Sequence, residues 1–152
     1  MSDKSSSGPP SGPSARPYRL DDQVGHLLRR AYQRASGHLA GRIRSYDLTP
    51  VQHATLIRLW EFGPLSQNQL GRLVAMPPAN IHALVRRLEA RALVRRDPSP
   101  KDKRLLTVSL TDEGRKMAEA LVPLDTASTE DALKPLDAKE RESLYAILKK
   151  IV

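Results

Sequence analysis

The chain has 152 residues, and 25 lysines and arginines against 17 aspartates and glutamates give it a formal net charge of +8. This length fits one domain with short extensions, and the excess of positive charge favours a polyanionic partner. The absence of cysteine excludes disulfides, thiol redox sensing and thiolate metal sites. No apolar run approaches the length of a membrane span or forms the core of a signal peptide, so we expect a cytoplasmic protein without a membrane partner.

Residues 1–17 include twelve serine, glycine or proline residues and almost no side chain that a core could bury. Such a segment cannot gain enough from apolar burial to offset the entropy lost on ordering. We therefore expect a disordered tail ahead of the folded part.

A long amphipathic helix is expected after Leu20, with Asp21 as its N-cap. Its apolar residues recur at spacings of three and four down to about Ser45: Val24, Leu27, Leu28, Ala31, Ala35, Leu39 and Ile43. A helix of about 24 residues would be about 36 Å long, more than a small helical lobe requires. Part of its apolar stripe therefore needs another partner.

A second helix is expected to begin at Thr49 and Pro50, a capping residue followed by proline at the first helical position. Val51, Ala54, Ile57 and Trp60 give this helix one apolar side, and Leu56 and Leu59 widen it. We expect Trp60 to pack in the core, because large aromatic side chains at helical spacing usually do.

The segment from Ser66 to Ala90 predicts two short helices joined by a tight turn. Ser66 and Gln69 have the spacing of a capping box, and Pro77 and Pro78 separate the helices. The apolar stripe of the second helix is Ile81, Leu84, Val85 and Leu88. This arrangement is typical of a helix-turn-helix, whose second helix enters the DNA major groove.

The opposite face of that second helix carries small, amide, imidazole and basic side chains. We predict that Asn80, His82 and Arg86 contact bases, since such groups can read base edges. The residues predicted to bind phosphates are Arg72, Arg87, Lys101, Lys103 and Arg104. Taken alone, the helix fits equally well an ordinary surface helix with two solvated arginines.

Two strands are expected at 93–97 and 105–110, joined by a turn-rich basic tip over 98–104. From Arg86 to Arg104 there are eight lysines and arginines against three acidic residues, a balance of +5 within a total of +8. Charge concentrated beside a candidate recognition helix indicates phosphate binding, although a solubilising loop is the alternative.

Two helices complete the chain. Thr111 is expected to cap a helix that Pro123 kinks without ending, and that continues to about Lys134. Asp137 and Glu140 cap a final helix. Its apolar face consists of Leu144, Ile147, Leu148 and Ile151, and we expect an assembly to cover it.

Four motifs together resemble the MarR family of bacterial transcription regulators. The residues that carry the resemblance are Leu70–Leu73 with Met76, Leu84–Val94, Asp97 with Asp102–Arg104, and Leu110–Gly114. The likeness extends from Leu20 to Val152. The chain departs from the family pattern at Pro77, where a capping residue is usual, and at Ala92, where glycine is common.

The resemblance implies a mainly α fold with a small β-wing. It divides the chain into a winged helix-turn-helix lobe over 49–111 and a helical dimerisation region formed by 18–48 and 112–152. It also implies a homodimeric repressor in which Asp102 pairs with an arginine and braces the wing. A two-fold dimer would place its recognition helices about 34 Å apart, and so would bind an inverted-repeat operator in double-stranded DNA.

The family resemblance further implies a small aromatic effector, a carboxylate or phenol, bound between the dimer helices and the DNA-binding lobe. The opening 18–25 resembles a subgroup tied to aromatic-acid catabolism. The candidate effector residues are Arg30, Arg34, His38, Arg42, His53 and Ile57. An arginine can hold a carboxylate through two parallel hydrogen bonds, but exposed charges and core histidines are the alternative interpretation.

Other classes of function have less support. The four histidines are scattered without ligand spacing, so we predict no metal site. No phosphate loop or nucleophile motif occurs, and no paired carboxylates lie beside a histidine in plausible geometry, so we predict neither an enzyme nor a cofactor. A winged-helix module used only for protein contacts remains the alternative, because the fold alone does not establish DNA binding.

Overall fold

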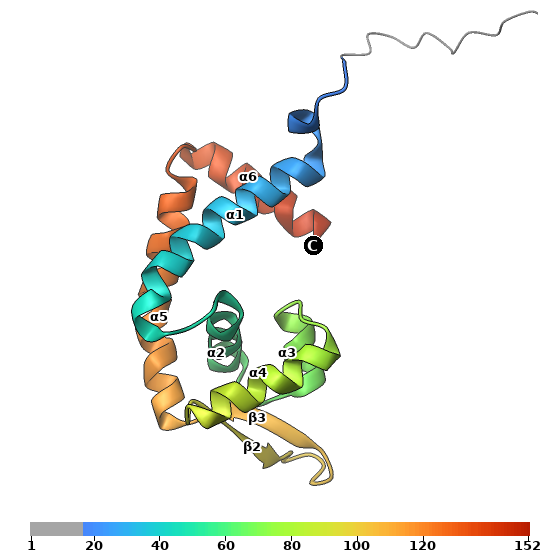
Figure 1. Cartoon of the computed structure of the whole chain (residues 1–152), viewed down its shortest axis with the longest axis vertical. Coiled ribbons are helices and arrows are strands. Elements are labelled where there is room, and N and C mark those ends of the chain that lie inside the picture. The colour runs from blue at the N-terminus through green and yellow to red at the C-terminus, as the bar shows by residue number, and fades with distance from the viewer. Residues whose placement is uncertain (1–16) are drawn as a thin grey trace, which may run out of the picture.

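The computed structural model describes residues 17–152, and the predicted tail over 1–17 lies almost entirely outside them. Figure 1 shows a helical end built from α1, α5 and α6 and a lobe built from the other elements, with α5 running between the two. The helices are α1 (Val24–Ile43), α2 (Pro50–Phe62), α3 (Gln67–Leu73), α4 (Pro78–Ala90), α5 (Asp112–Leu133) and α6 (Ala138–Ile151). The strands are β1 (Leu65–Ser66), β2 (Val94–Pro98) and β3 (Leu106–Leu110). The mainly helical fold with a small β-wing is confirmed.

Three of the helices begin with capping boxes. The boxes at Ser66 and Asp137 were predicted, whereas Thr49 was predicted only as a capping residue. The side chains of Thr49, Ser66 and Asp137 each accept a hydrogen bond from the backbone three residues on. The glutamine or glutamate at that position accepts one from the capping residue's own N–H. The ends of α2, α3 and α6 are therefore fixed locally, before any tertiary contact.

The predicted start of α1 is wrong. Leu20–Asp22 form a short 3-10 turn, and α1 begins at Val24 with Gln23 at its N-cap. Asp21 does not cap the helix, because its carboxylate faces Arg30 at 3.3 Å and His26 at 3.6 Å. With 20 residues, α1 is about 30 Å long and not 36 Å.

The packing predicted for Trp60 is also wrong, since this side chain is 38% exposed. The side of α2 that faces the core carries His53, Thr55, Leu56 and Leu59. The side that contains Trp60 and the side that contains Leu56 and Leu59 both have helical spacing. The fold buries Leu56 and Leu59 almost completely. Periodicity alone did not distinguish them because α2 is apolar over much of its circumference.

The core of the lobe lies beneath α4. Ile81, Leu84, Val85 and Leu88 are buried as predicted, and they belong to one cluster with Leu70 of α3 and Val108 of β3. Removing each such side chain from water contributes about 1.5–3 kcal/mol. This stripe fixes the orientation of α4 and turns its polar face outward.

The sheet is antiparallel, with the order β1-β3-β2. Val94 pairs with Leu110 at the base of the wing, and Pro98 pairs with Leu106 toward its tip. Both strands of the wing begin one residue later than predicted. The sequence did not predict β1, because a strand of two residues has no measurable period.

The wing returns to the helical region at a tightly packed junction. The Thr111 hydroxyl donates to the Ala92 carbonyl at 2.6 Å and accepts from the Gly114 N–H at 3.0 Å. A Cβ atom on Gly114 would lie 1.9 Å from the Leu93 carbonyl oxygen. From this junction α5 runs past Pro123 without interruption, so its predicted continuation to about residue 134 is confirmed.

Apolar side chains of α1 and α6 lie uncovered in the single chain. On α1, Val24 and Tyr32 are 71% and 69% exposed; on α6, Ile147 and Ile151 are 57% and 59% exposed. No helix within residues 17–152 is long and apolar enough to span a bilayer.

Ala92 follows α4 at the position where the MarR pattern commonly has glycine. Its φ of +54° lies in the left-handed region, so alanine occupies a conformation that favours glycine. We expect Ala92→Gly to raise the free energy of unfolding by about 0.5–1 kcal/mol, because relief of about 1–2 kcal/mol of strain exceeds glycine's entropic disadvantage. Urea unfolding at fixed protein concentration measures the change. The matched control Ala83→Gly, inside α4, should lower stability by about 1 kcal/mol. A loss of stability in both variants would contradict the strain at Ala92.

Gly114→Ala should destabilise the chain by at least about 1–3 kcal/mol, because the added methyl group overlaps the Leu93 carbonyl and cannot be relieved by a side-chain rotation. Thermal and urea unfolding report the change. Gly37→Ala on α1 is the control, since nothing lies within 4 Å of the added Cβ and helix propensity favours alanine. Equal stability of the Gly114 variant and the wild type would show that the junction is loosely packed.

Candidate nucleic-acid interface

The polar face of α4 is open to solvent along its length. Asn80, His82, Arg86 and Arg87 are all exposed, opposite the buried stripe that begins at Ile81. A shallow groove on this face is lined by Ala83, Arg86, Arg87 and Ala90. The sequence-predicted reading residues therefore share one outward face, where small side chains permit close approach of a ligand.

The turn between α3 and α4 is tight. Met76 N–H donates to the Gly71 carbonyl at 2.8 Å, and a Cβ on Gly71 would lie 3.2 Å from the Met76 oxygen. Pro78 is the first residue of α4, as predicted, and Pro77 at the N-cap provides no side-chain hydrogen bond. The first turn of α4 is thus held by Pro77's carbonyl and by packing. Arg72 is exposed at a groove on the α3 side of this turn.

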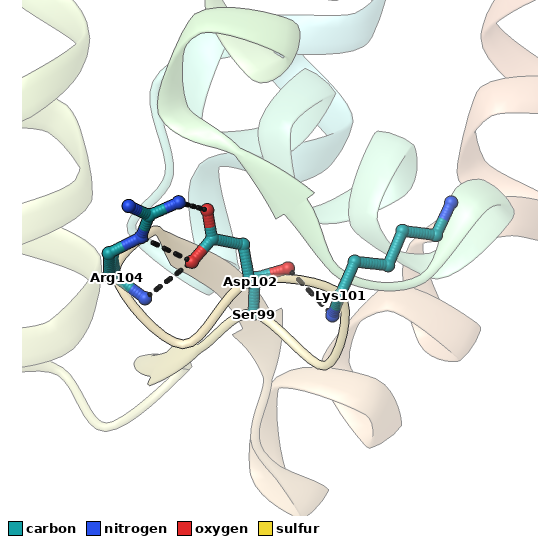
Figure 2. Close-up of polar contacts among 4 residues, drawn as sticks. All are labelled: Ser99, Lys101, Asp102 and Arg104. Carbon is teal, nitrogen blue, oxygen red and sulfur yellow. Dashed lines mark hydrogen bonds and ion pairs between the residues drawn. The ribbon is translucent and has the colours of Figure 1, made fainter.

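At the tip of the wing, Asp102 and Arg104 form a bidentate pair (Figure 2). Arg104 Nε and Nη2 donate to the two carboxylate oxygens at 3.0 and 2.9 Å, and the Arg104 backbone N–H donates to Oδ1 at 3.0 Å. These bonds lower the pKa of Asp102 below its ordinary value and raise the pKa of Arg104. The predicted pairing of Asp102 with an arginine is confirmed. In Figure 2 the Lys101 side chain points away from the pair.

At the root of the wing, α4 is tied to β2 by an ion pair that the sequence analysis missed. Arg96 Nε and Nη2 donate to the Glu89 carboxylate at 2.8 and 2.5 Å, and the hydrogen bond raises the pKa of Arg96. Each side chain is 25% exposed, so solvent screens the pair only partly. In the sequence, this pair was indicated only by the opposite charges of Glu89 and Arg96 on the two sides of the predicted helix–strand junction.

Ion pairs reduce the number of cations available for a polyanion. Within residues 17–152, Arg95, Arg96 and Arg104 are paired with carboxylates. The basic residues from α4 through the wing without an ion pair in this part of the chain are Arg86, Arg87, Arg91, Lys101 and Lys103. The positive charge thus concentrates at α4 and at the wing tip.

Two of the candidate effector residues contact carboxylates on α5. Arg42 pairs with Asp131, and Nε2 of the buried His53 lies 3.0 Å from Oδ2 of Asp125. The His53 and Asp125 atoms are close but are not aligned as a hydrogen bond, so Nε2 has no hydrogen-bond partner in the described chain. Neither aspartate was predicted from the sequence, because contacts between distant helices leave no local pattern.

The other four candidates are spread over α1 and α2. Arg30 pairs with Asp21, Arg34 is exposed on α1, and His38 and Ile57 are half-buried. Four grooves found within residues 17–152 are lined by other residues. The six candidates therefore do not meet in one of these grooves. Nor do three histidine, aspartate or glutamate side chains of the described residues gather as a metal site.

Comparison with known proteins gives consistent results. A model of the MarR family matches residues 46–105. The HTH-type transcriptional repressor NicR of Pseudomonas putida is 38% identical over 136 residues, covering 90% of this chain and 86% of NicR.

Two solved structures share the fold. A probable transcriptional regulator from Pseudomonas aeruginosa is 44% identical with a TM-score of 0.80, covering 88% of this chain and all of that one. BpsR of Bordetella bronchiseptica, whose DNA binding is regulated by 6-hydroxynicotinic acid, is 34% identical with a TM-score of 0.82, covering 90% of this chain and 97% of BpsR. Together with the helix-turn-helix and its braced wing, these similarities show that the chain belongs to the MarR family of transcription regulators.

Proposed function

We propose that this chain is a homodimeric repressor that binds an inverted-repeat operator through α4 and is released by a small aromatic acid. The observation that carries the proposal is the exposed face of α4, where Asn80, His82 and Arg86 lie opposite a fully buried stripe. Arg87, Lys101 and Lys103 flank this face without ion pairs in residues 17–152 and would bind phosphates.

The proposed dimer accounts for the uncovered apolar surface of the helical end. Val24 and Tyr32 of α1 and Ile147 and Ile151 of α6 are the kind of side chains that a protein interface buries. A two-fold axis through this end would present two copies of α4 about one turn of DNA, about 34 Å, apart. Such symmetry requires an operator with inverted half-sites.

We assign the effector to small aromatic acids on the basis of BpsR, whose DNA binding is regulated by 6-hydroxynicotinic acid. In this chain an effector carboxylate would compete with Asp131 for Arg42, or an effector would bind Nε2 of His53, which has no hydrogen-bond partner within residues 17–152. Either change would alter how α1 or α2 contacts α5, and α5 leads directly to the wing. The effector would thereby change the spacing of the two recognition helices.

Salt dependence distinguishes this function from a winged-helix module that contacts only proteins. A dimer that neutralises about six to ten phosphates should lose about 10³–10⁵ in affinity for duplex DNA between about 50 and 200 mM salt. Fluorescence anisotropy with a labelled duplex, selected from random sequences by the protein itself, measures this slope. Failure to select any duplex, or a flat salt dependence, would support the protein-only module.

His53→Ala should weaken release from DNA by 6-hydroxynicotinic acid while leaving DNA affinity nearly unchanged, because His53 is buried at the α2–α5 contact and is not one of the proposed DNA-binding residues. Titration of the acid into the protein–DNA complex, followed by anisotropy, measures the response. His26→Ala on α1 is the matched control and should respond like the wild type. An unchanged midpoint in the His53 variant would remove this residue from the effector site.

A further inference from the structure

A basic groove lies where the end of α1 and the start of α2 meet the second half of α4. It encloses about 580 Å³ and is lined by Ala40, Arg44, Asp47, Leu48, Thr49, Gln52, Arg87 and Arg91. Three arginines and one aspartate give the groove a positive balance. None of the sequence-derived DNA contacts except Arg87 belongs to it.

Arg91 forms a fixed wall of this groove. Its Nη1 donates to the Asp47 carbonyl at 2.6 Å, and its Nη2 donates to the Tyr46 carbonyl at 2.9 Å. These carbonyls belong to the α1–α2 turn, where Asp47 adopts a left-handed φ of +52°. Because carbonyl groups carry no net charge, the guanidinium keeps its full positive charge while holding the turn against α4.

Arg44 and Arg87, unlike Arg91, have side chains that the structure does not tie to the turn. Both side chains are exposed, and neither forms an ion pair within residues 17–152. Arg44 lies in the short 3-10 helix Arg44–Tyr46 that follows α1, whereas Arg87 comes from α4. The groove therefore combines one anchored arginine with two whose guanidinium groups are available to an anion.

Arg87 also connects this groove to the reading face of α4. It lines the shallow groove with Ala83, Arg86 and Ala90 as well as the deeper one with Arg44. An α-helix in the major groove lies between two phosphate backbones, and B-DNA carries one negative charge for about every 1.7 Å of helix axis. A backbone bordering α4 beside Arg87 would therefore bring phosphates to Arg44. The first turn of α2, a helix of 13 residues, adds a favourable dipole beside Thr49.

We propose that this groove is a further backbone-phosphate site of the DNA interface, in which Arg44 and Arg87 bind one phosphate and Arg91 positions the turn that carries Arg44. The proposal rests on the DNA-binding function proposed above. It adds a contact from the α1–α2 turn, outside the helix-turn-helix and the wing. The contact is independent of base sequence, because phosphates carry no sequence information.

Arg44→Gln tests this site in the full-length chain with a mixed-sequence duplex of about 30 base pairs as the probe. We expect weaker binding and a shallower plot of log affinity against log salt. The slope should change by up to about 0.9 for each subunit, because Arg87 alone neutralises the shared phosphate less completely. Arg44→Lys should retain most of the wild-type slope, because it keeps the charge. Lys139→Gln, an exposed charge at the start of α6, is the control and should leave the slope unchanged.

A second measurement uses the unmutated chain, so it does not depend on the folding of a variant. Phenylglyoxal modification followed by mass spectrometry should show Arg44 protected when the same duplex is bound, whereas Arg29 on α1 should react equally with and without DNA. Equal reactivity of Arg44 in both states, or a wild-type slope in Arg44→Gln, would overturn the proposed site. Absence of salt-dependent DNA binding in the wild type would instead overturn the proposed function itself.

Discussion

Burial of one helical stripe determines what the rest of the molecule can do. Ile81, Leu84, Val85 and Leu88 are almost fully excluded from water, so the opposite side of α4 must face outward. Because an α-helix places positions three and four apart on the same side, this one constraint exposes Asn80, His82 and Arg86 together. The hydrophobic effect thus orients the polar face of α4, the face proposed to contact DNA.

The stripe already packs α4 against Val108 of the wing, and polar contacts strengthen this link. Glu89 and Arg96 join the end of α4 to β2, and Thr111 joins the turn after α4 to the first residues of α5. Gly114 permits a carbonyl to approach where any side chain would collide. The recognition helix, the wing and α5 are therefore coupled through short polar contacts around Ala92, within a few residues of one another.

Much of this arrangement could be predicted from local patterns. Capping boxes, paired prolines and an apolar stripe each act within a few residues, so Ser66, Pro78 and Ile81 were placed correctly. Predictions failed where two local solutions compete, as at Asp21, whose carboxylate binds side chains of α1, and at Trp60, on an α2 that is apolar on more than one side. Contacts between distant segments, such as Arg91 with the α1–α2 turn, leave no periodic trace in the sequence.

The contrast between local patterns and distant contacts also separates the proposed DNA-binding face from the proposed effector site. A recognition face needs exposed residues on one rigid helix, whereas an effector crevice must be assembled from several helices. In the single chain two basic groups of α1 and α2 already have carboxylate neighbours, since Arg42 faces Asp131 and His53 faces Asp125. An acidic effector of the kind proposed above would therefore act by exchange at Arg42, where it would replace an internal carboxylate. Because both aspartates belong to α5, which begins at the wing, such an exchange would change the support of the DNA-binding lobe directly.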